Sequence, residues 1–335
     1  MTRVLAAPDK FRGTATAPEA AAAIAAGVGD AGGSCVRHPL ADGGEGTVDA
    51  FGGANRWSEV AGPAGRPVRA GWRLTDEGDA VLEMAAASGL VAAGGADRND
   101  PWDATTAGTG ELILAATAAG ARRIIVGLGG SATTDGGWDA LEVLRQHPRW
   151  QDPASRPELV VCCDVTTAFV DAAAVFGPQK GADPDTVSRL ADRLRALQDR
   201  YRDEFGVDVS ALPGAGAAGG LAGGLAVLGA RLAPGFDLVA DVTGFDTALS
   251  EADLVITGEG HLDAGSYDGK VVGGVLHRAR GRGVPVVAVV GRQTRSDRDD
   301  EDLTVLELVS FVGADAAIGD TTASIRRVVA EYLAG

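Results

Sequence analysis

The sequence predicts an α/β protein of two α/β domains, one of them built on a mainly parallel sheet. Its 335 residues exceed the size at which a single hydrophobic core usually stops growing. Short apolar runs that end in glycine or acidic residues alternate with alanine-rich helical stretches, which is typical of βαβ units. With 45% hydrophobic and 23% charged residues, the chain has the composition of an ordinary globular protein.

The first elements already follow this pattern. A strand is expected over residues 4–7, followed by an alanine-rich helix with Thr16 as N-cap and Pro18 in its first turn. Further buried strands are expected over residues 124–126, 159–162, 254–257 and 286–290. Ligands of open α/β sheets bind at the carboxyl ends of the strands, so the loops after these strands are the candidate sites.

Residues 57–85 interrupt the βαβ pattern, because glycine and proline turns there indicate β-hairpins. We interpret this segment as the entry to a second domain. The predicted division is a discontinuous first domain over residues 1–55 and 240–335, with a second domain, residues 56–239, inserted into it. Residues 188–205 are expected to form an amphipathic surface helix, and the charge-dense residues 292–302 an exposed loop.

Charge and cysteine content limit the possible partners. A net charge of −16 would repel a phosphate backbone, so we expect no nucleic-acid partner. The three cysteines show no CxxC spacing, which indicates a reducing compartment. No apolar stretch approaches the length of a membrane span. A cytoplasmic location with no membrane partner is expected, and the sequence is silent on oligomeric state.

Lysine is rare in this chain. There are three lysines, Lys10, Lys180 and Lys270, against 27 arginines, and each lies in a glycine-rich segment. One interpretation is that these positions need a compact ammonium group where the planar guanidinium of arginine would not fit. The alternative is that the three lysines persist by chance.

Two candidate sites lie near the N-terminus. Residues 7–13 (APDKFRG) leave the first strand and bring together Asp9, Lys10 and Arg12, which favours a site over a surface salt bridge. In residues 41–47 (ADGGEGT), Asp42 and Glu45 flank a glycine pair. Such carboxylates can hold Mg²⁺ with water and phosphate oxygens as the remaining ligands, and a plain glycine turn is the alternative.

Two more candidates follow later strands. Residues 127–137 (GLGGSATTDGG) can form a nest of backbone N–H groups for phosphate, although no Walker A sequence occurs in the chain. Residues 257–263 (TGEGHLD) place Glu259 and Asp263 at a strand end, with Lys270 shortly after. Phosphoryl transfer needs a carboxylate to orient the attacking hydroxyl and cations to neutralise developing charge.

Residues 214–219 (GAGAAG) match the dinucleotide-binding fingerprint by letter. Pro213 precedes them and no good buried strand leads into them, so the strand-turn-helix context is weak. We interpret these glycines as close packing at a helix N-terminus.

Nine motifs together carry a resemblance that no single one would carry. The chain resembles the bacterial glycerate kinase family in the segments 7–13, 41–47, 83–90 (EMAAASGL), 108–116 (GTGELILAA), 120–137, 163–166 (CDVT), 176–182 (FGPQKGA), 212–220 and 253–263. The resemblance implies two α/β domains with a cleft between them, one of them flavodoxin- or Rossmann-like. It further implies ATP, Mg²⁺ and D-glycerate, with 2-phosphoglycerate as the favoured product.

We expect the candidate residues to have distinct roles in phosphoryl transfer. Gly129, Gly130 and Ser131 cradle phosphate, Lys10 and Lys270 neutralise it, and Asp263 or Asp135 orients the acceptor hydroxyl. Asp42 and Glu45 hold Mg²⁺, and Arg12 or Lys180 binds the substrate carboxylate. The set expected to bind substrate or phosphate is completed by Asp9, Thr133, Asp164 and Glu259.

The chain departs from the family pattern at Arg12, Thr134, Thr167, His261 and Gly265, where the family usually has Lys, Asn, Asn, Arg and Gln. Two alternatives therefore stay open: a paralogous kinase for another small hydroxy acid, and a family member that binds ligand without turnover. The retained acidic residues and Lys270 argue against the second.

Overall fold

The chain forms two compact units, each with its own β-sheet. The computed structural model describes residues 2–295, 300 and 303–335. Unit 1 comprises Met1–Asp42, Asp49–Gly52 and Pro234–Gly335, and unit 2 comprises Gly43–Val48 and Gly53–Ala233. Both ends of the chain therefore contribute to unit 1. The expected loop over 292–302 includes residues 296–299 and 301–302, which lie outside the described residues.

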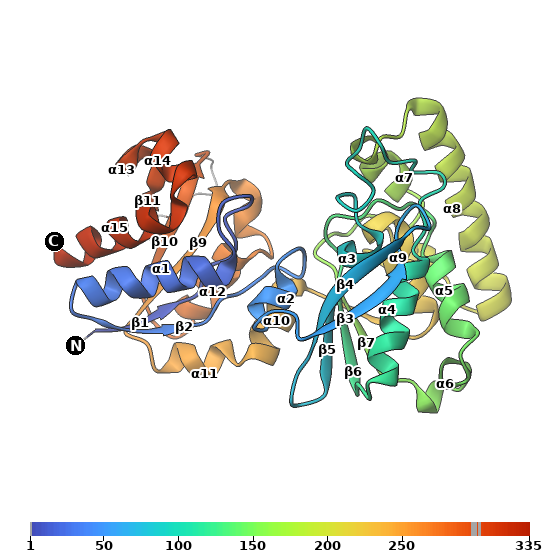
Figure 1. Ribbon diagram of the computed structural model, residues 1–335, viewed down its shortest axis with the longest axis horizontal. Coiled ribbons are helices and arrows are strands. Elements are labelled where there is room, and N and C mark those ends of the chain that lie inside the picture. The colour runs from blue at the N-terminus through green and yellow to red at the C-terminus, as the bar shows by residue number, and fades with distance from the viewer. Residues whose placement is uncertain (1, 296–299, 301–302) are drawn as a thin grey trace. The chain divides into compact units, whose positions relative to one another are not determined.

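Unit 1 is built on a five-stranded parallel sheet with the order β11-β10-β9-β1-β2. Blue N-terminal strands and orange to red C-terminal strands lie in this one sheet (Figure 1). The strand bounds are β1 Arg3–Ala6, β2 Ser34–Arg37, β9 Leu254–Leu262, β10 Val286–Gln293 and β11 Thr304–Glu307. Parallel strands share one carboxyl edge, so the segments after β1, β9 and β10 meet there.

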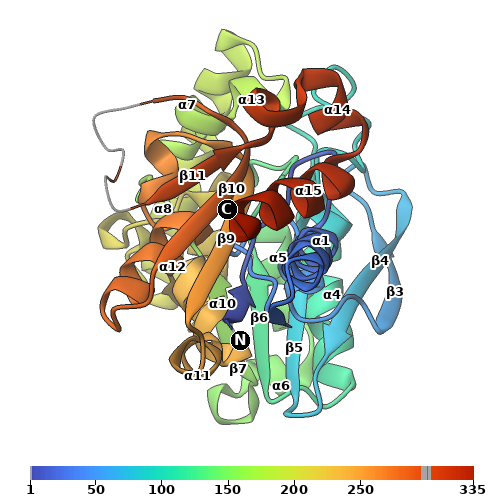
Figure 2. The same ribbon diagram turned by 90° about the vertical axis from the view of Figure 1, so that its left-hand side faces the viewer.

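Helices cover both faces of this sheet. Alternate β1 residues point to opposite faces, so Val4 packs with α1 and α15, whereas Leu5 packs with α10, α11 and α12. Figure 2 shows α1 and α15 on the same side of the sheet. The helix bounds are α1 Ala17–Asp30, α10 Gly235–Thr243, α11 Phe245–Ser250, α12 Val271–Arg280, α13 Leu308–Val312, α14 Ala314–Gly319 and α15 Thr321–Ala334.

Helix α1 begins where the sequence predicts. The Glu19 amide donates to Thr16 Oγ1 at 3.3 Å, and the Thr16 amide donates to Glu19 Oε2 at 2.8 Å. This capping box satisfies two amides that a helix end would otherwise leave unpaired. Further along α1, a Cβ on Gly27 would lie 2.4 Å from the Arg326 carbonyl oxygen. Only glycine therefore allows α1 and α15 to pack this closely.

Unit 2 contains a six-stranded mixed sheet with the order β3-β4-β5-β6-β7-β8. The β3–β4 and β4–β5 pairs are antiparallel, which confirms the hairpins predicted over 57–85, and the other pairs are parallel. The strand bounds are β3 Arg56–Ala61, β4 Pro67–Leu74, β5 Asp79–Glu83, β6 Arg123–Gly127, β7 Glu158–Cys162 and β8 Arg231–Ala233. The two sheets confirm the predicted α/β class.

The helices of unit 2 enclose a large apolar core that includes Trp150, Phe169 and Tyr201. Helix α8 buries Leu190, Leu194 and Tyr201, which confirms the predicted amphipathic surface helix. The helix bounds are α3 Ala85–Ser88, α4 Ala107–Ala118, α5 Trp138–Arg145, α6 Pro148–Gln151, α7 Ala172–Phe176, α8 Pro184–Phe205 and α9 Leu221–Val227. The short α2, Thr47–Ala50, belongs in part to each unit.

Residues 214–219 do not follow a strand. A 3₁₀ turn, Val209–Ala211, precedes them, and a second one, Ala217–Gly220, leads into α9. A Cβ on Gly219 would lie 2.0 Å from the Thr133 carbonyl oxygen. This contact confirms that the glycines serve close packing rather than a dinucleotide fold. No helix in the described part of the chain is both long and apolar enough to cross a membrane.

Candidate active site

A cavity of about 550 Å³ lies in unit 1, at the carboxyl edge of its sheet. The loops after β1 and β9, the end of β10 and the start of α12 contribute to its walls. Seven residues that the sequence proposed for chemistry line it together: Asp9, Lys10, Arg12, Asp42, Glu259, Asp263 and Lys270. Residues far apart in the chain thus come together because parallel strands share this edge.

The segment after β1 is held firmly against β9. The Asp9 amide donates to the Gly258 carbonyl at 2.8 Å, and Thr257 Oγ1 donates to the Ala7 carbonyl at 2.8 Å. Phe11 is buried, and its amide donates to the Ala15 carbonyl at 2.8 Å. Lys10 and Arg12, which flank Phe11, are therefore attached to a fixed backbone at the cavity wall.

Asp9 and Lys10 form a pair at the base of this segment. Asp9 Oδ1 accepts a hydrogen bond from the Lys10 amide at 2.7 Å and lies 3.6 Å from Lys10 Nζ. Burial raises the pKa of Asp9 to about 6, with Lys10 opposing this rise and the Asp42 charge adding to it. Asp9 thus fixes the position of the Lys10 ammonium group beside the cavity.

Strand β9 runs further than the sequence indicates. The expected strand ended at residue 257, but β9 continues to Leu262, with Glu259 opposite Val290 and His261 opposite Arg292. Glu259 therefore lies within a strand, and the prediction that it follows a strand end was wrong. A Cβ on Gly258 would lie 2.1 Å from the Val289 carbonyl oxygen, so this glycine permits close strand pairing and does not end the strand.

Glu259 is unusual among the cavity carboxylates. The residue is 9% exposed, and its buried Oε1 has no hydrogen-bond partner among the described residues. Burial raises the pKa of Glu259 to about 7, the Ser266 hydroxyl and the Lys270 charge oppose this rise, and the charges of Asp9 and Asp263 add to it. Glu259 can therefore gain or lose a proton near neutral pH.

Asp263 and Lys270 belong to the turn between β9 and α12. Asp263 Oδ1 accepts from the Gly265 amide at 2.8 Å, and the Asp263 amide donates to Ser266 Oγ at 3.0 Å. Lys270 is the N-cap residue of α12. A Cβ on Gly265 would lie 3.2 Å from Asp263 Oδ1 and 4.0 Å from Lys270 Nζ, so Gly265 borders both charged groups without filling the space beside them.

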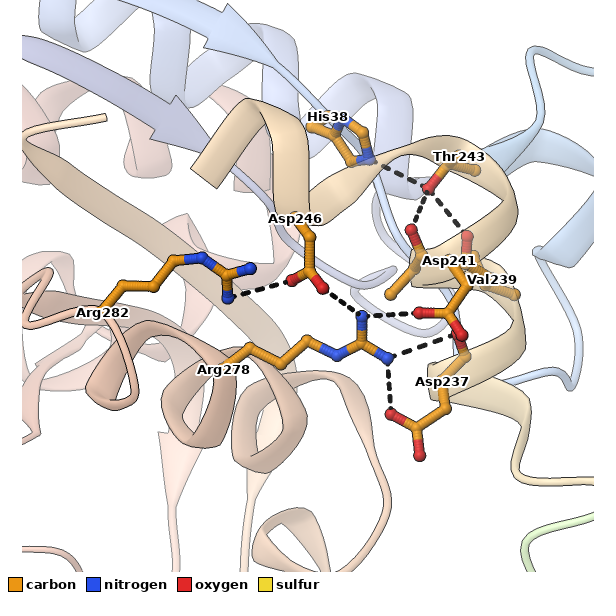
Figure 3. A network of polar contacts seen from close by, with 9 residues as sticks. His38, Asp237, Val239, Asp241, Thr243, Asp246, Arg278 and Arg282 are labelled. Atoms are coloured by element: carbon orange, nitrogen blue, oxygen red, sulfur yellow. Dashed lines mark hydrogen bonds and ion pairs between the residues drawn. The ribbon is translucent and has the colours of Figure 1, made fainter. Parts of the chain in front are cut away.

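A network of ion pairs around Arg278 fixes helix α12 (Figure 3). Lys270 is the N-cap residue of the same helix. The Arg278 guanidinium lies 2.7 Å from Asp237, 2.7 Å from Asp241 and 3.3 Å from Asp246. Its side chain is only 14% exposed, so these pairs are better shielded from water than ordinary surface pairs. The sequence did not identify Arg278, because its partners lie more than 30 residues away on α10 and α11.

The remaining proposed site residues lie in unit 2. The glycine loop 127–137 follows β6 and contacts residues 43–47 through backbone: the Leu128 amide donates to the Gly43 carbonyl at 3.1 Å. A Cβ on Gly129 would lie 2.7 Å from the Glu45 nitrogen. Gly130 and Glu45 are exposed, as is Asp164 after β7, whereas Ser131 is half-buried. The glycine loop therefore lies against the backbone of Glu45, whose side chain is exposed.

Asp135 lies in the interior of unit 2. Asp135 Oδ2 accepts from the Thr106 amide at 2.8 Å and from the Thr106 hydroxyl at 2.7 Å, and Asp135 Oδ1 accepts from the Gly137 amide at 3.1 Å. Burial raises its pKa. With both oxygens engaged by the protein, Asp135 holds the end of the glycine loop.

Lys180 is also internal, at 1% exposure. Its Nζ donates to the Thr133 carbonyl at 2.6 Å, and burial lowers its pKa to about 7, against the opposing charge of Asp135. Asn99, which the sequence analysis missed, donates from Nδ2 to the Ala132 carbonyl at 3.0 Å and to the Lys180 carbonyl at 2.8 Å. Lys180 is thus tied to the glycine loop through both its side chain and its backbone.

The donor groups of the described residues suit a metal ion that is bound together with phosphate. Within the described residues, no three or more His, Cys, Asp or Glu side chains form a group that could hold a metal ion without further ligands. Mg²⁺ commonly takes one or two carboxylates and completes its shell with water and phosphate oxygens. Single carboxylates such as Asp42 and Glu45 fit that mode, and they do not fit a structural metal site.

Comparisons with known proteins agree with these observations. A sequence model described as "Glycerate kinase family" matches residues 4–149 and 146–333. A glycerate kinase of Halalkalibacterium halodurans is 39% identical over 328 residues, which cover 87% of this chain and 86% of the relative. The glycerate 2-kinase of Escherichia coli K12 is 38% identical over 331 residues, with 87% and 86% covered.

A solved structure is similar over almost the whole length. A protein of Salmonella typhimurium LT2, described as a candidate glycerate kinase 2, superposes with a TM-score of 0.85 at 34% identity. The match covers 99% of this chain and 97% of that one. The resemblance carried by the nine motifs is thereby confirmed, and the chain belongs to the glycerate kinase family.

Proposed function

We propose that this protein is a kinase that transfers the terminal phosphoryl group of ATP to D-glycerate, with Mg²⁺, and forms 2-phosphoglycerate. The observation that carries this proposal is the unit 1 cavity, where Lys10, Arg12 and Lys270 lie among four carboxylates. A chain with a net charge of −16 repels anions in general, so a site for anionic substrates must concentrate its own cations. In this cavity four cations, Lys10, Arg12, Lys270 and Arg292, balance the four carboxylates, although the chain as a whole is strongly acidic.

The proposed roles follow the contacts. Lys10 and Lys270 would neutralise charge on the phosphoryl group, and Arg12, which is exposed at the cavity wall, would bind the glycerate carboxylate. We assign Lys180 to the support of the glycine loop, because its ammonium group already donates to Thr133. Asp9 would position Lys10, and Asp263 would orient the turn that carries Lys270.

In unit 2, the glycine loop would bind phosphate through its backbone amides. Gly129, Gly130 and Ser131 supply accessible backbone, Thr133 adds a buried hydroxyl, and Asp135 holds the loop in shape. Asp164 is exposed after β7 and remains a proposed contact. Asp42 and Glu45 are the proposed Mg²⁺ ligands. Bound Mg²⁺ would supply neutralisation of phosphate charge during transfer.

A cytoplasmic location is part of the proposal. None of Cys35, Cys162 and Cys163 forms a disulfide, which is compatible with a reducing compartment.

The test is a coupled assay of ADP release with ATP, Mg²⁺ and a panel of small hydroxy acids. D-glycerate should give the highest kcat/KM. A hydroxy acid preferred by about tenfold or more would instead support a paralogous kinase. That second candidate has a specific basis. At His261 and Gly265 this chain departs from its family's usual residues. His261 lines the cavity, and Gly265 borders Asp263 and Lys270.

A further inference from the structure

We propose that Glu259 is the general base that takes the proton of the acceptor hydroxyl during phosphoryl transfer. The inference rests on the proposed function and assigns a role that the sequence analysis gave to Asp263 or Asp135. It follows from comparing what each carboxyl group already contacts.

The cavity carboxylates differ in how far the protein already engages them. Asp9 Oδ1 accepts from the Lys10 amide and lies near the Lys10 ammonium group. Asp263 Oδ1 accepts from the Gly265 amide and caps the turn that follows. Glu259 lines the same cavity and its carboxyl group is hydrogen-bonded by the Ser266 hydroxyl, yet its Oε1 is buried and lacks a hydrogen-bond partner within the part of the chain that is described.

A buried oxygen without a hydrogen-bond partner lowers the stability of the folded protein. Such a group in a folded protein calls for an explanation, and a proton or a donor supplied by a ligand is one. A substrate hydroxyl is a donor of this kind. The position of Glu259 beside the cavity therefore suits a carboxyl group that is completed only when substrate binds.

Asp135 does not offer this possibility. Thr106 and Gly137 donate to its two oxygens, and its side chain lies in the interior of unit 2. To accept a substrate proton it would have to break contacts that hold the glycine loop.

The backbone also holds Glu259 more rigidly than a loop would. It lies in β9, paired with Val290 of β10, and the paired strands continue to Leu262. Gly258 and Gly260 flank it, and a Cβ on Gly291 of β10 would lie 2.4 Å from the Gly260 carbonyl oxygen. A general base must be held in a fixed position near the proton it accepts, and a paired strand fixes the backbone that carries Glu259.

The electrostatic surroundings support the same role. An ordinary glutamate is a weak base at neutral pH, whereas a carboxyl with a pKa of about 7 is matched to proton transfer there. The charged groups that face Glu259 are Asp9 after β1, Asp263 after β9 and Lys270 at the start of α12. The other charged or titratable residues of the cavity wall are Lys10, Arg12, Asp42, His261 and Arg292.

The transfer forms one bond to phosphorus and breaks another. The glycerate oxygen forms a bond to the terminal phosphorus of the nucleoside triphosphate, and the bond from that phosphorus to its bridging oxygen breaks. The electron pair of the broken bond stays on the nucleoside diphosphate. The hydroxyl proton moves to the Glu259 carboxylate and then leaves to solvent.

The decisive experiment compares wild type with Glu259→Gln, which keeps the shape and removes the base. We expect kcat to fall about 100-fold or more, while the KM for glycerate and the calorimetric affinity for glycerate change by less than about threefold. In wild type, kcat/KM should fall in acid with an apparent pKa near 7, and this acid limb should be absent in the residual activity of the variant. Glu251→Gln, the same change at an exposed residue of unit 1, should match wild type.

Two further variants separate a base from a merely structural group. Glu259→Asp keeps a carboxylate on a shorter side chain, so it should recover part of the activity together with an acid limb. Asp263→Asn removes a neighbouring carboxylate, and it should keep the acid limb even if kcat falls. Loss of the limb in Asp263→Asn but not in Glu259→Gln would overturn the assignment.

Failure of this inference can be distinguished from failure of the proposed function. If wild type phosphorylates glycerate and Glu259→Gln keeps kcat within about tenfold, the base assignment is wrong and the function stands. If wild type does not phosphorylate glycerate, both are wrong.

Discussion

The ammonium nitrogen of Lys180 donates to the Thr133 carbonyl oxygen at 2.6 Å, inside unit 2. Residues 47 apart in the chain are thereby joined, and the buried Lys180 side chain supports the glycine loop from the interior of unit 2. A buried lysine of this kind affects stability in a way that depends on pH.

We predict that Lys180→Met changes the pH dependence of stability. The pKa of Lys180 falls from 10.5 to about 7 on folding, so between these values the unfolded chain binds more protons and wild-type stability rises with pH. The methionine variant lacks this rise. Melting temperatures should therefore favour wild type over the variant more at about pH 9.5 than at about pH 7. An equal difference at both pH values would contradict the buried, titrating state of Lys180.

Lys270 should be needed for turnover and not for folding. If its charge stabilises the transferring phosphoryl group, Lys270→Ala should lower kcat by about 100-fold or more, which corresponds to about 3 kcal/mol. Its side chain is half-buried at the start of α12 and adds little packing, so the melting temperature should stay close to that of wild type. Steady-state kinetics with thermal melting checks both statements, and Arg195→Ala on the surface of α8 is the control.

Lys270→Arg is the sharper test of the same residue. It keeps the charge but changes the shape and reach of the cation beside Gly265. We expect a clear loss of activity in this variant as well. Wild-type kinetics would mean that charge alone matters there, and that the rarity of lysine in this chain has no functional cause.

Removal of metal should stop turnover and leave the fold intact. The described residues offer no group of ligands that could hold an ion without phosphate, so Mg²⁺ is expected to serve the reaction and not the structure. With excess chelator, ADP release should cease while circular dichroism and the melting temperature stay unchanged. Unfolding by the chelator would show that the assignment of Asp42 and Glu45 is wrong.

Glu259→Gln should also be visible in the stability of the protein without substrate. Folding raises the pKa of Glu259 from 4.5 to about 7, so the folded state binds the proton more tightly and wild type loses stability as pH rises through this window. Glutamine does not titrate. The variant should therefore gain melting temperature relative to wild type between about pH 5 and pH 7, and a constant difference would contradict the raised pKa.

Sequence alone predicts those features whose causes lie within a few neighbouring residues. Thr16 and Glu19 form their capping box within one helical turn, and the start of α1 was predicted correctly. The length of β9 depends on β10, about 30 residues away, and on a backbone approach that only glycine allows at Gly258. Taken alone, that glycine indicated a loop, and the strand was predicted too short.

The candidate site shows the same limit. The motifs identified seven of the residues that line the unit 1 cavity, because chemistry-bearing side chains follow strand ends in any open α/β sheet. They did not distinguish residues that line a cavity from those that support a loop. Lys180 carries the same side chain as Lys10, but its contact with Thr133 places it in the interior.

The most direct test of the proposed function is phosphorus NMR of a reaction with D-glycerate, ATP and Mg²⁺. We predict a new phosphomonoester signal that appears with ADP and is split into a doublet, because the phosphate of 2-phosphoglycerate couples to a single proton on the adjacent carbon. A triplet would place the phosphate on the terminal hydroxyl and contradict the 2-position. The absence of any new phosphomonoester from folded, active-site-intact protein would contradict the central claim.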